Sequence, residues 1–464
     1  MIRFSLSFAL ACLACVRYEA RPLDPARHPA ELRSRDLRDS ALLADVARYT
    51  GQPDGHRWSD RQLAVAALRQ RSDLRLLRAE WRAARRAVRT AGERPGVALQ
   101  GDLERRVSGR DEGGPWVVAV SGLFILELGG KRGARLQAAR AGATVAESRL
   151  LGAAWAVATE TRQAAAGLAQ AFGEVDDARD EVRLLEQVHM LERARYEEGA
   201  LGTSDLARTS TEIQNARLSL AEAEHAVLRA RATLAGALAM PVGALESVKP
   251  APTPRAGCPA LDAADADALV AQALSRRYEV PLALGNYALA ESRLRLEVAR
   301  QYPDLELGPG FIWDQGVNRW TLALALPALF GSRNRGAIAE ADAAREVAGL
   351  EVAATQDSVL ADIESAIQRC RGAALELEAA DSVVAAATRL MERDRAAYRR
   401  GETSGLEPAR TELQLLRARR AHRRAERGLH EASLDLERAV GGPSSASTEW
   451  PDPRQDPEEE VARP

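Results

Sequence analysis

Aromatic residues are scarce in this chain of 464 residues. Phe, Trp and Tyr make up 4% of it, whereas 46% of the residues are hydrophobic, so most of the apolar content is Ala, Leu and Val. A compact α/β enzyme of this size normally needs more large rings to fill its core. Small apolar residues interleaved with Arg and Glu are typical instead of long, closely packed helices.

The chain also lacks an excess of either charge and lacks long apolar runs. Its net charge is −2, which gives no electrostatic reason to expect nucleic acid as a partner. Of the 64 basic residues only Lys131 and Lys249 are lysines. No run of about 18 apolar residues follows the N-terminus, which excludes a bundle of transmembrane helices. Transmembrane β-strands are not excluded, because they are short and alternate in polarity.

Sequence signatures of catalysis are missing. The chain has no Walker A loop, GxGxxG, HExxH or CxxC motif, and its six His and four Met are scattered. Carboxylates lie mostly on helical faces where Arg neighbours can pair with them. We therefore expect no enzyme activity, no catalytic residue, no metal site and no cofactor. Cys258 and Cys370 have no partner at metal-ligand spacing, and the sequence indicates no disulfide framework.

The first 15 residues have the features of a secretory signal peptide. Arg3 precedes an apolar run, Phe4–Leu13, and small residues and cysteines follow. A Cys after a small residue also resembles a lipoprotein cleavage site, which makes Cys15, or alternatively Cys12, a candidate for lipid attachment. Cleavage after Ala14 or Ala20 without a lipid is the alternative. Either cut predicts export.

The rest of the chain is a tandem duplication. Tyr196-Glu-Glu-Gly199 recurs as Tyr398-Arg-Arg-Gly401, and Ala207-Arg208-Thr209 recurs as Ala409-Arg410-Thr411, with the same offset of 202 residues. A period this long indicates a duplicated domain rather than a short solenoid repeat. The predicted units are a tether (16–57), a first repeat (58–241), a Pro-rich linker (242–262), a second repeat (263–443) and a disordered, acidic tail (444–464).

Each repeat contains a pair of long helices. From Lys131 to Tyr196 apolar residues recur three or four positions apart, which predicts one helix ~100 Å long. A second helix follows from Ser204 to about Met240. The second repeat predicts the same pair over 334–398 and 404–440. Helices this long must pack along one another, because no globular core can cover them.

Two blocks, 95–128 and 302–330, lack the helical spacing of apolar residues, and each predicts two strands around a turn. The predicted strands are 97–107, 116–126, 304–313 and 319–327. Large apolar residues alternate with small or polar ones, which suits a tilted strand that crosses a bilayer in about 10 residues. A soluble hairpin packed on a helix would also explain one apolar face. Six residues are the candidates for a lipid-facing surface: Trp116, Phe124, Phe311, Trp313, Trp320 and Leu324.

Four strands cannot close a membrane barrel by themselves. The smallest such barrel has about eight strands, and open strand edges are not tolerated in lipid. If these strands lie in a membrane, at least two chains must contribute to one barrel.

The ordered set of repeats, hairpins and helix pairs resembles the TolC family of outer-membrane efflux proteins. The blocks Leu126–Arg132 and Gly331–Ala337, which close the two hairpins, are similar to those of the branch associated with cobalt–zinc–cadmium resistance. The resemblance implies a mainly α fold with a small β part. It implies a homotrimer whose 12-stranded barrel, four strands per chain, contacts outer-membrane lipid and continues into a periplasmic α-helical barrel. It further implies a passive exit duct for a tripartite efflux system, with a periplasmic adaptor, an inner-membrane pump of the RND type and metal cations as candidate cargo.

The same resemblance places the channel's aperture and adaptor-docking surface at the turns of the helix pairs. The corresponding residues are Tyr196, Gly199, Asp205, Tyr398, Gly401 and Glu407. Thr403 stands where the family commonly has an aperture arginine, so Arg399, Arg400 or Arg410 would have to substitute. The alternative for Asp205 is an ordinary first-turn acid that stabilises the helix dipole.

Two other functions remain open at this stage. One is a duct for type I protein secretion, because the pump rather than the duct selects the cargo. The other is a soluble periplasmic coiled-coil adaptor whose hairpins never enter a membrane.

Overall fold

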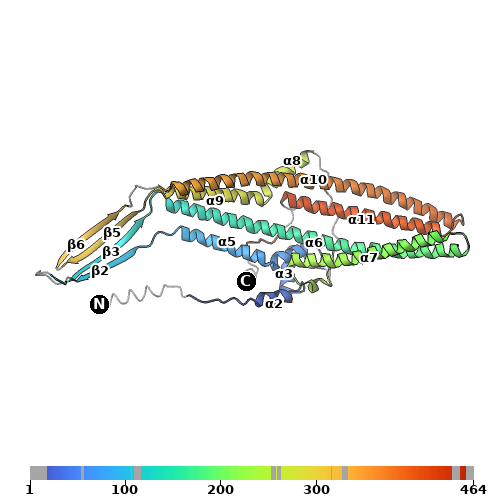
Figure 1. Cartoon of the computed structure of the whole chain (residues 1–464), viewed down its shortest axis with the longest axis horizontal. Helices are drawn as coiled ribbons and strands as arrows, with labels where there is room; N and C mark the ends of the chain where they lie inside the picture. The colour runs from blue at the N-terminus through green and yellow to red at the C-terminus, as the bar shows by residue number, and fades with distance from the viewer. Residues whose placement is uncertain are drawn as a thin grey trace.

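The computed structural model of the chain is a long, mainly helical molecule with a small sheet at one end (Figure 1). It describes residues 18–53, 57–105, 107–108, 116–251, 258, 263–314, 316–326, 333–441 and 450–455. The predicted signal peptide, with Cys12 and Cys15, lies outside these ranges. The mainly α fold class with a small β part is confirmed.

The molecule has four long helices. They are α6 (Lys131–Glu197), α7 (Thr203–Leu238), α10 (Arg335–Arg399) and α11 (Leu406–Val440). Two of the four, α6 and α10, run most of the length of the molecule, and the other two, α7 and α11, are about half as long and lie in the half away from the sheet. α6 has 67 residues and therefore spans ~100 Å. Each pair is joined by a turn with a glycine, Gly199 or Gly401, at φ +75°, a conformation that other residues adopt only with strain. Among the described residues, none of the helices has the length and hydrophobicity that a membrane crossing requires.

Shorter helices complete the half of the molecule nearest the sheet. α5 (Ser72–Ala91) lies along α6, and α9 (Glu279–Ala299) lies between α6 and α10. The side-by-side order is therefore α5, α6, α9, α10 near the sheet and α7, α6, α11, α10 toward the turns (Figure 1). The same helix, α10, forms one free edge at both levels.

The sheet is antiparallel and has the order β2-β3-β5-β6. Its strands are β2 (Ala98–Arg105), β3 (Trp116–Leu126), β5 (Leu305–Asp314) and β6 (Val317–Ala325), compared with the predicted 97–107, 116–126, 304–313 and 319–327. β3 and β5 join the two repeats, so β2 and β6 are the free edges among the described residues.

The expectation that 16–57 forms a simple tether is wrong for much of its length. α2 (Arg27–Ser34) and α3 (Ser40–Thr50) fold there, and Leu37, Leu42 and Val46 are buried in one core with α4 (Asp60–Gln70) and α6. β1 (Arg57–Trp58) pairs with β4 (Lys249–Pro250) in the linker, which also holds the short helix η1 (Val242–Leu245). The polar composition of the segment gave no sign that these three apolar residues enter one core.

The predicted disorder of 444–464 is also wrong for the described residues 450–455. The Trp450 ring meets that of Trp155 edge-on with centroids 6.3 Å apart, and the Arg78 Nε donates to the Pro453 carbonyl at 2.8 Å. One large ring and a hydrogen bond from α5 dock this short segment on α5 and α6. Pro- and acid-rich composition could not reveal that contact.

One disulfide is present, although the sequence indicated no disulfide framework. Cys258, in the linker between the repeats, is bonded to Cys370 of α10, with a Cα–Cα distance of 5.6 Å and a sequence separation of 112. Cys370 is fully buried beside Ile363 and Ile367, in the core that α10 forms with α8 (Ala263–Arg276) and α11. Spacing along the chain gave no sign of this pairing, because the fold alone brings the two thiols together.

Candidate functional site

The predicted aperture residues lie at the end of the molecule farthest from the sheet (Figure 1). Tyr196 and Tyr398 occupy the last turns of α6 and α10, and both rings are about half exposed. The structure thus brings the two predicted turns to one tip.

The two predicted acids do not connect the helix pairs. Asp205 and Glu407 lie in the first turns of α7 and α11, and each has a basic neighbour three residues on, Arg208 or Arg410, at 3.9 Å. This is the geometry of the alternative interpretation, in which a first-turn acid stabilises the helix dipole. Tyr398 packs its ring against Gly405. Within one chain, these predicted residues form no bond across the tip among the residues described.

The bond across the tip is made by residues that the sequence did not single out. The Glu192 carboxylate of α6 is only 2% exposed. It accepts a hydrogen bond from the Thr209 hydroxyl of α7 at 2.5 Å and one from the Arg410 guanidinium of α11 at 2.7 Å. Nearby, Arg195 Nη1 donates to Ser404 Oγ at 3.3 Å. Of the three candidate arginines, Arg410 is therefore the one that ties the helix pairs together, whereas Arg400 pairs locally with Glu402 at 2.6 Å.

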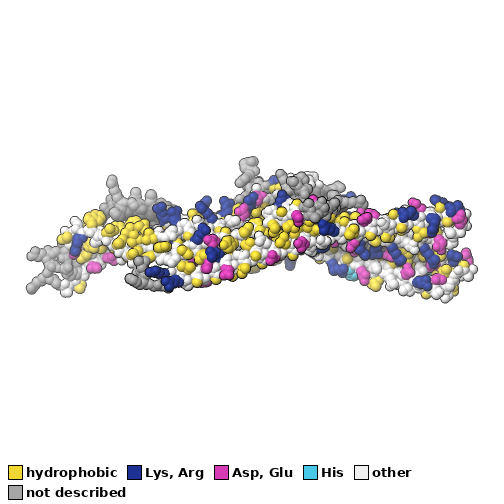
Figure 2. Space-filling view, turned by 90° about the horizontal axis from the view of Figure 1, so that it is seen from above, with side chains coloured by type: hydrophobic (Ala, Val, Ile, Leu, Met, Phe, Trp, Pro, Cys, Tyr) yellow, Lys and Arg dark blue, Asp and Glu magenta, His cyan; other side chains and the backbone are white. Residues whose placement is uncertain are grey.

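The same two helices are joined by charge along much of their contact. Arginines of α11 face carboxylates of α6 in antiparallel order, and we call this set the α6–α11 ladder. It comprises Arg410–Glu192, Arg417–Glu181, Arg420–Glu181, Arg423–Asp177 and Arg427–Glu174. Asp177 and Glu192 are buried. The arginines of the ladder therefore pair with carboxylates whose burial without a partner would cost free energy. Figure 2 shows blue and magenta side chains interspersed over this end of the molecule, whereas yellow ones gather nearer the sheet.

The sheet has one large apolar face. Cross-strand pairing sets Val120 opposite Phe311, and Phe311 opposite Trp320, whose ring is 5.2 Å from that of Phe311. The register also aligns Phe124 with Leu307 and Leu307 with Leu324. Residues in direct register point to the same face. All six candidates for the lipid-facing surface share that face: Trp116, Phe124, Phe311, Trp313, Trp320 and Leu324.

The opposite face mixes aliphatic residues, such as Val117, Ile125 and Ile312, with small and polar ones, and none of the described strand residues on it is aromatic. It carries Ala119 and Ser121 of β3, Thr321 and Ala323 of β6, and the ion pair between Arg319 and Asp314. Trp320 is 84% exposed in the single chain, so nothing described in this chain covers the apolar face. An uncovered face of aromatic and large aliphatic side chains requires either lipid or a partner.

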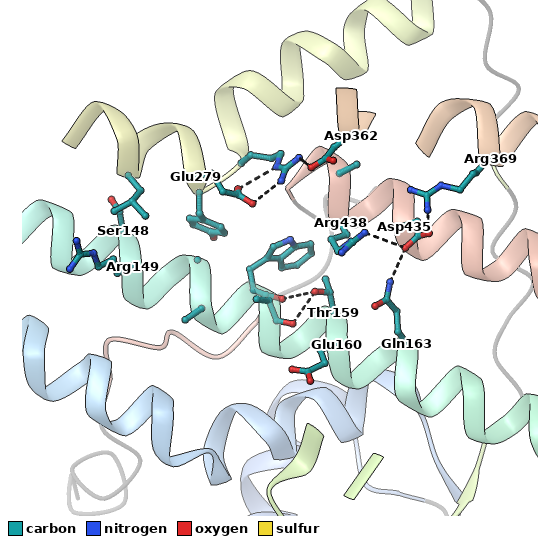
Figure 3. Close-up of a pocket in the computed structure, with 18 residues that line it drawn as sticks. Ser148, Arg149, Thr159, Glu160, Gln163, Glu279, Asp362, Arg369, Asp435 and Arg438 are labelled. Carbon is teal, nitrogen blue, oxygen red and sulfur yellow. Dashed lines mark hydrogen bonds and ion pairs between the residues drawn. The ribbon is translucent and has the colours of Figure 1, made fainter. Parts of the chain in front are cut away.

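A cavity of about 620 Å³ opens where α11 ends and α9 begins (Figure 3). Arg277 bridges Glu279 and Asp362 at 2.8 Å each, and Asp435 accepts from Gln163 at 2.8 Å and pairs with Arg369. Although burial opposes it, these hydrogen bonds raise the pKa of Arg277. These charged and polar side chains connect helices of the two repeats, so we assign them a structural role. In the described part of the chain, no three His, Cys, Asp or Glu side chains form a group that could hold a metal.

Comparison with known proteins identifies relatives of this architecture. The sequence profile of a family described as "Outer membrane efflux protein" matches residues 63–240 and 269–442, which correspond to the two repeats. No curated protein matches the chain significantly.

Solved structures share the fold at low identity. The outer membrane protein VceC of Vibrio cholerae is 18% identical, covers 82% of this chain and 96% of its own, and has a TM-score of 0.65. The CmeC outer membrane channel of Campylobacter jejuni is 14% identical, with 97% of each chain covered and a TM-score of 0.64. The open state of the MtrE outer membrane channel of Neisseria gonorrhoeae is 17% identical, with 86% and 95% covered and a TM-score of 0.63.

Proposed function

Because this chain belongs to the outer membrane efflux protein family, we propose that three copies form a passive exit duct through the outer membrane and periplasm. The observation that carries the proposal is the open, four-stranded sheet, which has one uncovered apolar face and continues directly into helices ~100 Å long. Four strands need partners to close, and three copies supply 12. A monodisperse monomer in mild detergent, or a protein that leaves the membrane without detergent, would contradict this function.

The duplication indicates how neighbouring copies meet. In the chain, α11 of the second repeat lies against α6 of the first. In the duplication, α7 of the first repeat corresponds to α11 of the second, and α6 corresponds to α10. In a ring of copies we therefore expect the equivalent contact, in which α7 of one copy lies against α10 of the next. These two helices are the free edges of the chain toward the tip.

Exposed residues on those edges support this interface. The pair Arg420–Glu181 within the chain corresponds, at the offset of 202, to Leu218 and Val383. These side chains are 60% and 54% exposed in the single chain, as expected for an apolar contact that only a second copy covers. Near the tip, Arg410–Glu192 corresponds to Arg208 and Asp394. We therefore infer a contact between copies that is apolar at Leu218 and Val383, where the contact inside one chain is ionic, and that stays oppositely charged near the tip.

The double variant Leu218→Cys/Val383→Cys should form disulfides between chains and give dimers and trimers on a non-reducing gel. Leu218 and Val383 lie on opposite edges of one chain, so they cannot pair within it. The matched control Leu218→Cys/Leu375→Cys moves one thiol by about 12 Å along α10 and should stay monomeric. Equal cross-linking in both variants would contradict the proposed register of α7 against α10 of the next copy.

The apolar face of the sheet is the proposed lipid contact. Trp320→Asp or Leu324→Asp should reduce the amount of protein assembled in the outer-membrane fraction several-fold, because a charge facing lipid costs up to a few kcal/mol near the bilayer midplane. The controls Thr321→Asp and Ala323→Asp lie on the opposite face and should assemble nearly normally. Equal tolerance at all four positions would show that the apolar face does not meet lipid.

At the tip we propose the aperture and the adaptor-docking surface. In a threefold assembly, Asp205 and Glu407 would supply rings of carboxylates at the mouth, while Tyr196 and Tyr398 would flank the Gly199 and Gly401 turns that a periplasmic adaptor contacts. The proposed pump is an inner-membrane protein of the RND type, and the similarity of the hairpin-closing blocks makes metal cations the proposed cargo. Lipid on Cys15 would add a second membrane anchor. Purification of the native complex tests these partners, because the pump that co-purifies identifies the cargo.

A further inference from the structure

The described C-terminal segment runs along α6 toward the sheet. Trp450 contacts Trp155, and four residues later Arg454 pairs with Glu147 at 3.0 Å. Hydrogen bonds to Asp452 and Glu147 raise the pKa of Arg454, so this contact remains ionic at any physiological pH. α6 begins at the sheet end, so a chain that passes from residue 155 to residue 147 is heading for the membrane end of the molecule.

A groove of about 820 Å³ between α5 and α6 continues this path. Arg454 and Gln455 line its near end, beside Glu147, and Trp81, Arg85, Arg89 and Arg140 line the remainder. The groove is therefore entered by the chain's own segment, and its far part is basic.

Three other arginines that line the groove, Arg85, Arg89 and Arg140, lack a carboxylate counterpart among the described residues. Arg85 stacks over the Trp81 ring, 5.0 Å from its centroid, and the one acidic residue of the groove, Glu147, is already paired with Arg454. Arg89 and Arg140 are exposed and have no ion-pair partner in the described part of the chain. Three guanidinium groups that line one groove repel one another unless anions lie between them.

We propose that this groove is the docking site of the chain's own acidic segment 456–460. Asp456, Glu458, Glu459 and Glu460 follow directly after Gln455, so four carboxylates meet three arginines at the place where the described segment ends. The lengths agree. From Glu147 to Arg140 the groove covers about 10 Å of α6, and five extended residues reach about 16 Å. Docking would fasten the tail that follows the second repeat onto α5 and α6 of the first, just below the sheet.

Cross-linking in the full chain tests this placement. Ala143 lines the groove and is small, so the variant Ala143→Cys/Glu459→Cys, treated with a short bismaleimide, should give an intrachain link that mass spectrometry identifies. The matched control Leu228→Cys/Glu459→Cys places the partner thiol on the exposed face of α7 and should link at least fivefold less. The link in the groove variant should decrease several-fold between 50 mM and 1 M NaCl, because salt screens exposed charges.

A charge exchange separates docking from mere proximity. Adding Arg85→Glu, Arg89→Glu and Arg140→Glu to the cross-linking variant should abolish the link. Further adding Asp456→Lys, Glu458→Lys and Glu460→Lys should restore it. A link between chains would assign the groove to a second copy and overturn the proposal. So would equal yields in the groove and control variants, or a yield that none of the charge changes affects.

Discussion

Arg410→Ala should loosen the tie between the helix pairs at the tip, where we propose the aperture, and raise the resting conductance of the channel in planar bilayers. The substitution leaves the Glu192 carboxylate buried, with only the Thr209 hydroxyl as a partner among the described residues. A hydrogen bond to a charged group contributes about 1.5–3 kcal/mol. Because the Arg410 side chain is 43% exposed, we expect a loss near the lower end of that range, which still shifts an equilibrium about tenfold.

Two further variants make this prediction specific. Arg400→Ala removes an exposed, local pair with Glu402 and should conduct like the parent. Glu192→Gln in the Arg410→Ala background removes the buried charge while keeping a group that can bond to Thr209, so it should bring the resting conductance back toward that of the parent. If Arg410→Ala conducts like the parent, the tip is held by contacts other than the α6–α11 ladder.

Replacing both Cys258 and Cys370 with Ser should lower the thermal stability of the second repeat. The disulfide closes a loop with a sequence separation of 112, for which chain entropy alone predicts a stabilisation of about 4–5 kcal/mol, with about 2–4 kcal/mol typical in practice. The Cys370→Ser change would also bring a hydroxyl into a fully buried apolar core. We expect the thermal midpoint measured in detergent to fall by several degrees.

Hydrogen exchange should locate this effect. Without the disulfide, α8 and the adjoining part of α10 should exchange faster, while α6 and α7 of the first repeat should change little. The parent protein under a strong reductant should behave like the double variant. An unchanged midpoint in both conditions would mean that the packing of Ile363, Ile367 and their neighbours holds this region without the covalent bond.

Much of the architecture follows from the sequence because its determinants are local. Helix periodicity predicted α6 over 131–196, within one residue of its observed end. Two strand faces and two glycine turns follow from period-two alternation and from the backbone freedom of Gly199 and Gly401, which depend on neighbouring residues alone. The duplication, which the sequence shows as matching residues at an offset of 202, predicted that the second half would have the same elements as the first.

The features that the sequence did not reveal join residues far apart in the chain. Glu192 and Arg410 are separated by 218 positions, Cys258 and Cys370 by 112, and Arg78 and Pro453 by 375. Each residue has an ordinary local context: an acid and an arginine on helices rich in both, two isolated cysteines, and a Pro- and acid-rich tail. Their partners are selected by the register in which the two repeats pack. The sequence by itself therefore determined the elements and their lengths, whereas only the tertiary structure decided which charges, thiols and segments meet, because those contacts depend on packing between distant elements rather than on the residues beside them.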